Sequence, residues 1–215
     1  MTKRTALIAG ASGLVGGECL QRLLASDVYS TVTVVTRRAL GPRAKHPKLR
    51  EIVVDFEQLD SARADLRADH VFCALGTTIR KAGSQARFRQ VDLEYPRHLA
   101  ELTLANGAKY FSLVSALGAS SKSGVFYSRT KGELEDALRA MGWPGLCLVR
   151  PSVIAGDRQE SRPLERLSEM LLRFGPSTYR PVDAGRIAAA MVATAQHEPR
   201  GVTIIESRDI ARAAG

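Results

Sequence analysis

The chain has 215 residues, enough for one domain with a substantial buried core. Its composition, 45% hydrophobic and 25% charged, is that of an ordinary globular protein and excludes an intrinsically disordered chain. The formal net charge of +9 raises the question of nucleic acid, but the basic residues are scattered, with no one-sided stripe on a helix and no basic tail. We therefore expect a solvated basic surface and no nucleic-acid partner.

No run reaches the roughly 18 consecutive apolar residues that a membrane span needs, and the first residues lead into a glycine-rich turn without a signal-peptide pattern. The three cysteines, Cys19, Cys73 and Cys147, are odd in number and lack the paired Cys or His spacing of a zinc site. We expect a soluble, cytoplasmic protein with reduced core thiols, no membrane association and no metal ion.

The first element expected is a strand at 5–10, TALIAG, followed by a helix. The clearest later helical patterns cover 84–105, where Pro96 predicts a kink or a restart, and 127–141. Further strands are predicted at 31–36, 51–56, 70–75, 109–115 and 145–150. Strands that alternate with helices predict an α/β fold, namely a Rossmann-type doubly wound parallel sheet.

The pattern loosens after residue 150 into a polar segment, a helix predicted near 163–173 and a last strand that begins at 201. This C-terminal third is too short to fold separately. We expect a single domain over 1–215, in which 152–215 forms the substrate-side part at the carboxyl ends of the strands.

The first turn reads G-A-S-G-L-V-G, with glycines at Gly10, Gly13 and Gly16 between a strand and a helix. Glycine permits a tight turn and the close approach of a pyrophosphate, and the N-terminus of a helix favours an anion. The alternative is that the glycines only make the turn.

Two arginines follow the second strand. An acid about 20 residues beyond the glycines usually holds the ribose 2′-hydroxyl of NAD, but here Thr36 is followed by Arg37 and Arg38. Guanidinium groups at this place could fork onto a 2′-phosphate, which predicts NADP. The alternative is two solvated arginines.

Residues 127–131 read YSRTK, which places Tyr127 and Lys131 one helical turn apart on the same face. Tyrosine has a pKa near 10 and is a poor acid or base at neutral pH unless its anion is stabilised. An ammonium one turn away lowers the pKa of the phenol by its charge. Alone the pair is a weak signal, because helices often pair an exposed tyrosine with a lysine.

The glycine turn, Ser115 at the end of a strand and the Y-x-x-x-K pair together resemble the short-chain dehydrogenase/reductases over most of the chain. Four blocks resemble more narrowly the atypical branch of oxidoreductases that contains the Tat-interacting tumour suppressor. They are VVDFEQLD at 53–60, CALGTTIRKAG at 73–83, YSRTKGELE at 127–135 and RPSVIAGDRQESRP at 150–163.

This resemblance implies a Rossmann domain that binds NADPH through residues from several strand ends. Asp55 and Phe56 match positions that often touch adenine, although a capping carboxylate explains Asp55 equally well. The other implied contacts are Ser12, Gly13, Leu14 and Val15 at the pyrophosphate, Arg37 and Arg38 at the 2′-phosphate, Leu75 and Gly76 at the adenosine side, and Ile154 and Arg162 near the nicotinamide half and the phosphates.

The resemblance also implies that Tyr127 protonates the substrate carbonyl, that Lys131 holds the nicotinamide ribose, and that Ser115 donates a hydrogen bond to the substrate oxygen. Two positions depart from the family pattern. Ala116 stands where relatives often have the catalytic serine, so either the turn begins early and aims Ser115 inward or the serine role is unfilled. Asp92 stands where many relatives have an asparagine, and we expect an exposed helical carboxylate there.

The function expected is an NADPH-dependent oxidoreductase, a monomer or homodimer, that reduces a small or medium carbonyl or quinone. An NADPH-binding redox sensor with little turnover is the main alternative. An epimerase or dehydratase is weaker, because the sugar-nucleotide domain expected for that activity is missing.

Overall fold

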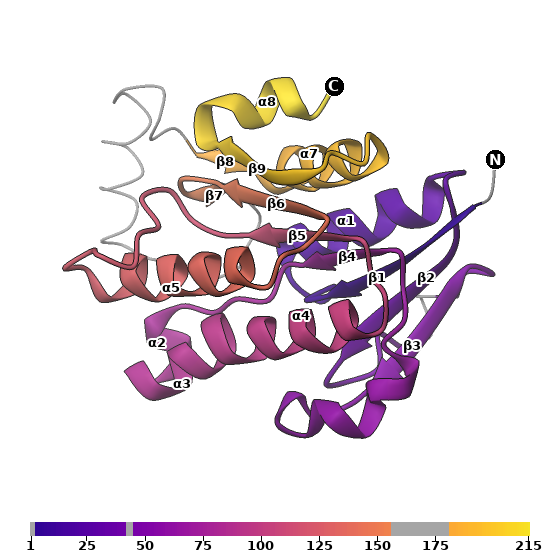
Figure 1. Ribbon diagram of the computed structural model, residues 1–215, viewed down its shortest axis with the longest axis horizontal. Coiled ribbons are helices and arrows are strands. Elements are labelled where there is room, and N and C mark those ends of the chain that lie inside the picture. The colour runs from indigo at the N-terminus through magenta and orange to yellow at the C-terminus, as the bar shows by residue number, and fades with distance from the viewer. Residues whose placement is uncertain (1–2, 42–44, 156–180) are drawn as a thin grey trace.

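The computed structural model describes residues 3–41, 45–155 and 181–215. Seven strands form one parallel sheet in the order β3-β2-β1-β4-β5-β6-β9 (Figure 1). These strands are β1 (Arg4–Ala9), β2 (Tyr29–Thr36), β3 (Leu49–Val53), β4 (His70–Cys73), β5 (Tyr110–Val114), β6 (Gly145–Arg150) and β9 (Gly201–Glu206). Two short strands, β7 (Ile154–Ala155) and β8 (Val182–Asp183), pair separately. The predicted α/β class with a doubly wound parallel sheet is confirmed.

Helices cover both faces of the sheet (Figure 1). One face carries α1 (Leu14–Ala25) and α7 (Ala184–Gln196), which pack against each other, with α8 (Ile210–Ala213) after the 3-10 turn η4 (Ser207–Asp209). The opposite face carries the 3-10 segment η1 (Phe56–Asp65), α4 (Tyr95–Ala105) and α5 (Phe126–Ala140). The short helices α2 (Ile79–Ala82) and α3 (Gln85–Arg89) precede α4.

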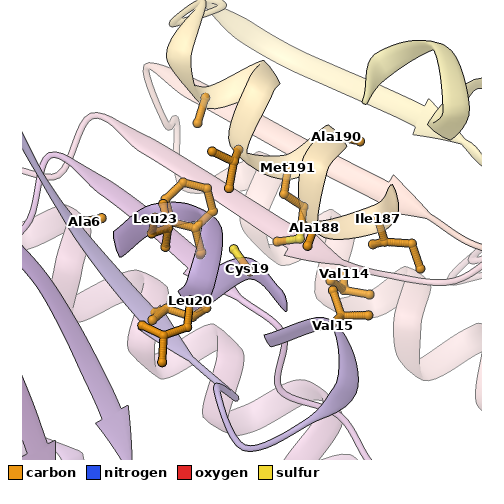
Figure 2. Close-up of a cluster of buried hydrophobic side chains, with 14 of the residues drawn as sticks. Ala6, Val15, Cys19, Leu20, Leu23, Val114, Ile187, Ala188, Ala190 and Met191 are labelled. Atoms are coloured by element: carbon orange, nitrogen blue, oxygen red, sulfur yellow. The ribbon is translucent and has the colours of Figure 1, made fainter. Parts of the chain in front are cut away.

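The central strand β1 explains why the sheet is buried on both sides. Ala6 and Ile8 face the layer of α1 and α7, whereas Leu7 and Ala9 face the layer of η1, α4 and α5. All four are fully buried, as expected for a parallel sheet covered by helices on both faces. Figure 2 shows the first layer, in which α1 and α7 meet through Val15, Cys19, Leu20, Leu23, Ile187, Ala188 and Met191.

The predicted helix at 84–105 contains a π turn. It consists of α3, the π segment η2 (Gln90–Glu94) and α4, with Pro96 at the start of α4. Proline has no N–H to donate to the carbonyl of Asp92, four residues earlier, so ordinary α-helical bonding cannot continue there. The predicted restart of the helix near Pro96 is confirmed.

The C-terminal elements extend the main domain. β9 pairs in parallel with β6, and α7 packs on α1, so both belong to the central sheet and its cover. The helix predicted at 163–173 lies outside the described residues, as do residues 156–180 of the predicted substrate-side part, 152–215. Among the residues that the structure describes, no helix is long and apolar enough to cross a lipid bilayer.

Candidate functional site

A cleft of about 960 Å³ opens at the carboxyl ends of β1, β2 and β4. The strand order changes direction here, because β2 lies on one side of β1 and β4 on the other. Open α/β sheets bind ligands at this switch point. The predicted residues that line the cleft are Gly10, Ser12, Gly13, Leu14, Arg37, Arg38, Phe56, Leu75 and Gly76.

The turn from β1 into α1 has steric reasons for its glycines. Gly10 has φ of +90°, and a Cβ on it would lie 2.5 Å from the carbonyl oxygen of Ala74. A Cβ on Gly16 would overlap the carbonyl oxygen of Gly10, so α1 begins directly against the turn. Val15 and Gly16 are accordingly buried under the cleft lining.

The N-terminus of α1 is prepared for an anion. Gly13 is its N-cap, no side chain caps the helix, and its first turn carries no acidic residue. The backbone N–H groups and the positive end of the helix dipole are therefore offered to the cleft, which fits a pyrophosphate.

Three cations line the cleft. Arg37 and Arg38 follow β2, and Lys81 comes from α2, which follows β4 in the chain. None of the described residues in the lining is acidic. The cleft thus favours a ligand that carries more than one phosphate group.

An aromatic and apolar wall lies beside these cations. Phe56 and Tyr95 have ring centroids 5.5 Å apart, and both line the cleft with Val91. The Tyr95 hydroxyl donates a hydrogen bond to Glu57 Oε1 at 3.0 Å, which fixes the ring. This wall fits the flat face of an adenine.

Asp55 takes the capping role instead. Its carboxylate accepts a hydrogen bond from the Glu57 N–H at 3.0 Å and caps η1, and it does not line the cleft. Of the predicted adenine pair, only Phe56 therefore reaches the cleft.

The sequence did not predict the cleft residues Lys81, Val91 and Tyr95. Val91 and Tyr95 are four residues apart in a predicted helix, so the sequence indicated their shared face but not its direction.

Asp92 and Lys131 form a buried ion pair, and the expectation of an exposed carboxylate was wrong. Lys131 Nζ lies 2.7 Å from Asp92 Oδ1, and the two side chains are 5% and 1% exposed. The contact falls outside hydrogen-bond geometry, and Oδ1 has no other donor among the described residues. The second oxygen, Oδ2, accepts a hydrogen bond of 2.8 Å from the Thr77 N–H. The π turn directs Asp92 inward because it interrupts the regular succession of helix faces.

Tyr127 lies in the first turn of α5, one turn before Lys131, as predicted. Its half-buried ring packs on Phe88, with centroids 5.6 Å apart. Burial by itself lowers the pKa of Lys131. The negative charge of Asp92, with a smaller effect of the neighbouring Tyr127, outweighs burial, so the pKa of Lys131 is above its ordinary value. The ammonium is therefore charged at neutral pH and lies within electrostatic range of the phenol.

Ser115 contacts a second buried cluster. Its hydroxyl donates a hydrogen bond of 2.6 Å to Glu135 Oε1, and Arg150 donates to both oxygens of Glu135 at 2.9 and 2.6 Å. Glu135 lies eight residues beyond Tyr127, about 12 Å along the helix axis. The structure thus brings Tyr127 and Lys131 together and bonds Ser115 to Glu135; a role for Ser115 at a substrate oxygen stays a prediction.

Two predicted residues remain. Ile154, in β7, is 37% exposed and does not contribute to the cleft lining. Arg162 lies outside the described residues.

Comparison with known sequences gives consistent matches. Residues 10–163 match a family described as NAD(P)H-binding. Protein HTATIP2 of Rattus norvegicus is 38% identical over 181 residues, which covers 83% of this chain and 74% of that protein. Protein FMP52, mitochondrial, of Candida albicans is 29% identical over 225 residues and covers 96% of both chains.

Solved structures share the fold at low sequence identity. MoeE5 in complex with UDP-glucose and NAD has a TM-score of 0.71 at 18% identity, covering 98% of this chain and 80% of that chain. The UDP-Glc/GlcNAc 4-epimerase of Campylobacter jejuni has a TM-score of 0.71 at 15% identity, covering 97% and 82%.

Proposed function

The chain belongs to the NAD(P)H-binding family, and we propose that it is an NADPH-dependent oxidoreductase that reduces a small or medium carbonyl or quinone, with Tyr127 as the acid/base. The observation that carries this proposal is the buried, charged Lys131 one helical turn from Tyr127. A buried ammonium beside a half-buried phenol is costly to maintain, and perturbed groups of this kind gather at functional sites.

The preference for NADPH rests on charge. A 2′-phosphate at the end of β2 would meet Arg37 and Arg38, with Lys81 contributing across the cleft. An acidic residue usually holds the ribose 2′-hydroxyl of NAD, and no described residue of the lining is acidic. The uncapped N-terminus of α1 would hold the pyrophosphate, and Phe56 and Tyr95 would flank the adenine.

Tyr127 is the proton donor in this proposal. Its hydroxyl would give a proton to the carbonyl oxygen of the substrate and would take one from an alcohol in the reverse direction. Lys131 stabilises the phenolate that remains, because opposite charges attract strongly where water is scarce. The nicotinamide, when bound, supplies the hydride for the carbonyl carbon.

The test uses purified protein, NADPH and a panel of aldehydes, ketones and quinones, with the absorbance of reduced nicotinamide as the readout. We expect turnover in the wild type, and its loss in Tyr127→Phe with NADPH affinity retained. Tyr110→Phe is the matched control, because it removes a buried phenol at the opposite end of the sheet. Equal turnover in Tyr127→Phe and wild type would refute the acid/base role.

A redox sensor with little turnover is the second candidate, and the Ser115 contact favours it. The serine hydroxyl is bonded to Glu135, and its neighbour Ala116 is apolar, so Tyr127 would act without a serine partner. Such a sensor would respond to NADPH rather than through thiols, since burial raises the pKa of Cys73 to about 12 and of Cys147 to about 11. Tight NADPH binding without turnover on any substrate supports this candidate.

We also propose that the protein is a cytoplasmic monomer or homodimer that binds no nucleic acid. The FMP52 relatives are named mitochondrial, so fractionation of the full-length chain with a mitochondrial marker tests the location. Light scattering tests the oligomeric state.

A further inference from the structure

We propose that Asp92 is a positioning residue that holds the Lys131 ammonium in place and charged beside Tyr127, so that the working unit of the site is Asp92, Lys131 and Tyr127. The catalytic consequence rests on the function proposed above. The ion pair itself is independent of that function, because Asp92 and Lys131 both belong to the protein.

Asp92 is fixed from two sides. Oδ2 accepts the Thr77 N–H at 2.8 Å, and the π segment η2 carries the carboxylate inward, where it is 1% exposed. Oδ1 then lies 2.7 Å from Lys131 Nζ. Because the Asp92 carboxylate is held through one of its oxygens, its other oxygen keeps the Lys131 ammonium in place.

Asp92 also accounts for the charge on Lys131. The other described groups that act on the ammonium are Tyr127 on the same helix and Cys73 at the end of β4. A phenol is neutral at pH 7, and burial raises the pKa of Cys73 to about 12, so the thiol is neutral as well. Asp92 is therefore the counter-charge at working pH, and a 5% exposed ammonium without it would tend to lose its proton.

The ion pair lies directly beneath the cleft. A Cβ on Gly76 would be 3.4 Å from Asp92 Oδ1 and 3.8 Å from Lys131 Nζ, so the backbone at this position covers both groups. Gly76 and Thr77 also line the cleft. The loop that would contact the cofactor thus also holds Asp92 and lies against Lys131.

The decisive experiment is an NMR titration of lysine labelled with ¹³C at Cε in the cofactor-free protein, with Lys131→Met to identify the signal. We expect Lys131 in the wild type to titrate above its ordinary value of 10.5. In Asp92→Asn, which keeps the acceptor for the Thr77 N–H but removes the charge, the midpoint should fall by about one pH unit or more. Equal midpoints in the two proteins would overturn the proposal.

Asp136→Asn is the matched control. It removes an exposed carboxylate from the same helix, where Asp136 pairs with Arg139, and should leave the Lys131 midpoint unchanged. Should Asp92→Asn fail to fold, the wild-type titration still decides, because a midpoint at or below 10.5 contradicts the proposed hold on the ammonium.

Kinetics add a second readout. With an active substrate, Asp92→Asn should lower kcat about 100-fold, change the NADPH affinity by less than about threefold, and move the alkaline limb of the pH profile to lower pH. Unchanged kcat and pH profile would refute the catalytic consequence. If the wild type turns over no substrate, the proposed function fails, while the titration still tests the role of Asp92.

Discussion

The hydroxyl of Ser115 lies 2.6 Å from Glu135 Oε1, and both side chains are buried. Because Glu135 also binds Arg150 through both oxygens, β5, α5 and β6 meet at one carboxylate. Tyr127, Lys131 and Glu135 follow one another at four-residue spacing along α5, on one face. A single helix therefore joins the proposed acid/base pair to a buried ion pair that holds strand ends together.

Glu135→Gln should lower the free energy of unfolding by about 1.5–3 kcal/mol, because Arg150 loses its buried counter-charge and keeps only the more exposed Glu206, which it contacts at 2.9 Å. Urea denaturation monitored by circular dichroism measures the change. Glu133→Gln is the control, since Glu133 pairs with Arg89 on the partly exposed side of the same helix and should cost about 1 kcal/mol or less. Similar losses in both variants would contradict the structural role of Glu135.

Ser115→Ala should lower the free energy of unfolding by about 1.5–3 kcal/mol, the range for a hydrogen bond to a charged group. Turnover should fall by less than about tenfold if the hydroxyl serves mainly Glu135. Denaturation and steady-state kinetics on the same preparation separate the two effects. A loss of turnover of about 100-fold or more with little loss of stability would instead support Ser115 as the donor to the substrate oxygen.

Arg37→Ala should weaken NADPH binding roughly 10- to 100-fold, because charge-assisted bonds to the 2′-phosphate are lost. NADH affinity should change little, since NADH lacks that phosphate. Titration calorimetry with both nucleotides measures this, with Arg50→Ala, an exposed arginine on β3, as the control for net charge. Equal loss for the two nucleotides would remove Arg37 from the 2′-phosphate.

Gly16→Ala should abolish measurable NADPH binding and lower the free energy of unfolding by about 3 kcal/mol, because the added Cβ overlaps the Gly10 carbonyl and pushes α1 off the turn. Gly17→Ala is the neighbouring control. Its Cβ would lie 3.4 Å from the Ala11 carbonyl oxygen, a tolerable contact, and alanine favours the helix. Thermal melting with and without NADPH tests both variants, and a normal Gly16→Ala protein would contradict the close packing.

The pH dependence of stability should differ between wild type and Asp92→Asn. In the wild type the folded pKa of Lys131 is raised, since the charge of Asp92 outweighs burial. The stability that this ion pair contributes is therefore present below the unfolded pKa and is lost as pH rises through the folded one. In Asp92→Asn we expect the folded pKa of Lys131 to fall below the unfolded value. The cost of burying its ammonium is then full at neutral pH and disappears as pH rises. The gap in free energy of unfolding between the two proteins should therefore narrow as pH rises toward 10.5 and onward to the raised folded pKa of the wild type. A constant gap would contradict the ion pair as its source.

The sequence by itself determined the fold and the start of the site. Some features are local in the sequence and can be predicted from periodicity and sterics. They are the strand and helix patterns, the glycine turn at Gly10 to Gly16, and the four-residue spacing of Tyr127 and Lys131. The same holds for Arg37 and Arg38, because the end of a parallel strand has a fixed place relative to its neighbours. These residues could be assigned to the cleft or the helix face without coordinates.

Only the tertiary structure decided which polar side chains meet inside. A π turn rotates the helix faces on its two sides by up to about 100°, so the periodicity around Asp92 predicted exposure where the chain buries an ion pair. The direction of Ser115 depended on Glu135, 20 residues away, and the approach of Lys81 and Tyr95 to the cleft depended on how α2 and α4 pack. Such contacts join residues distant along the chain, and their energies depend on burial, which local sequence does not specify.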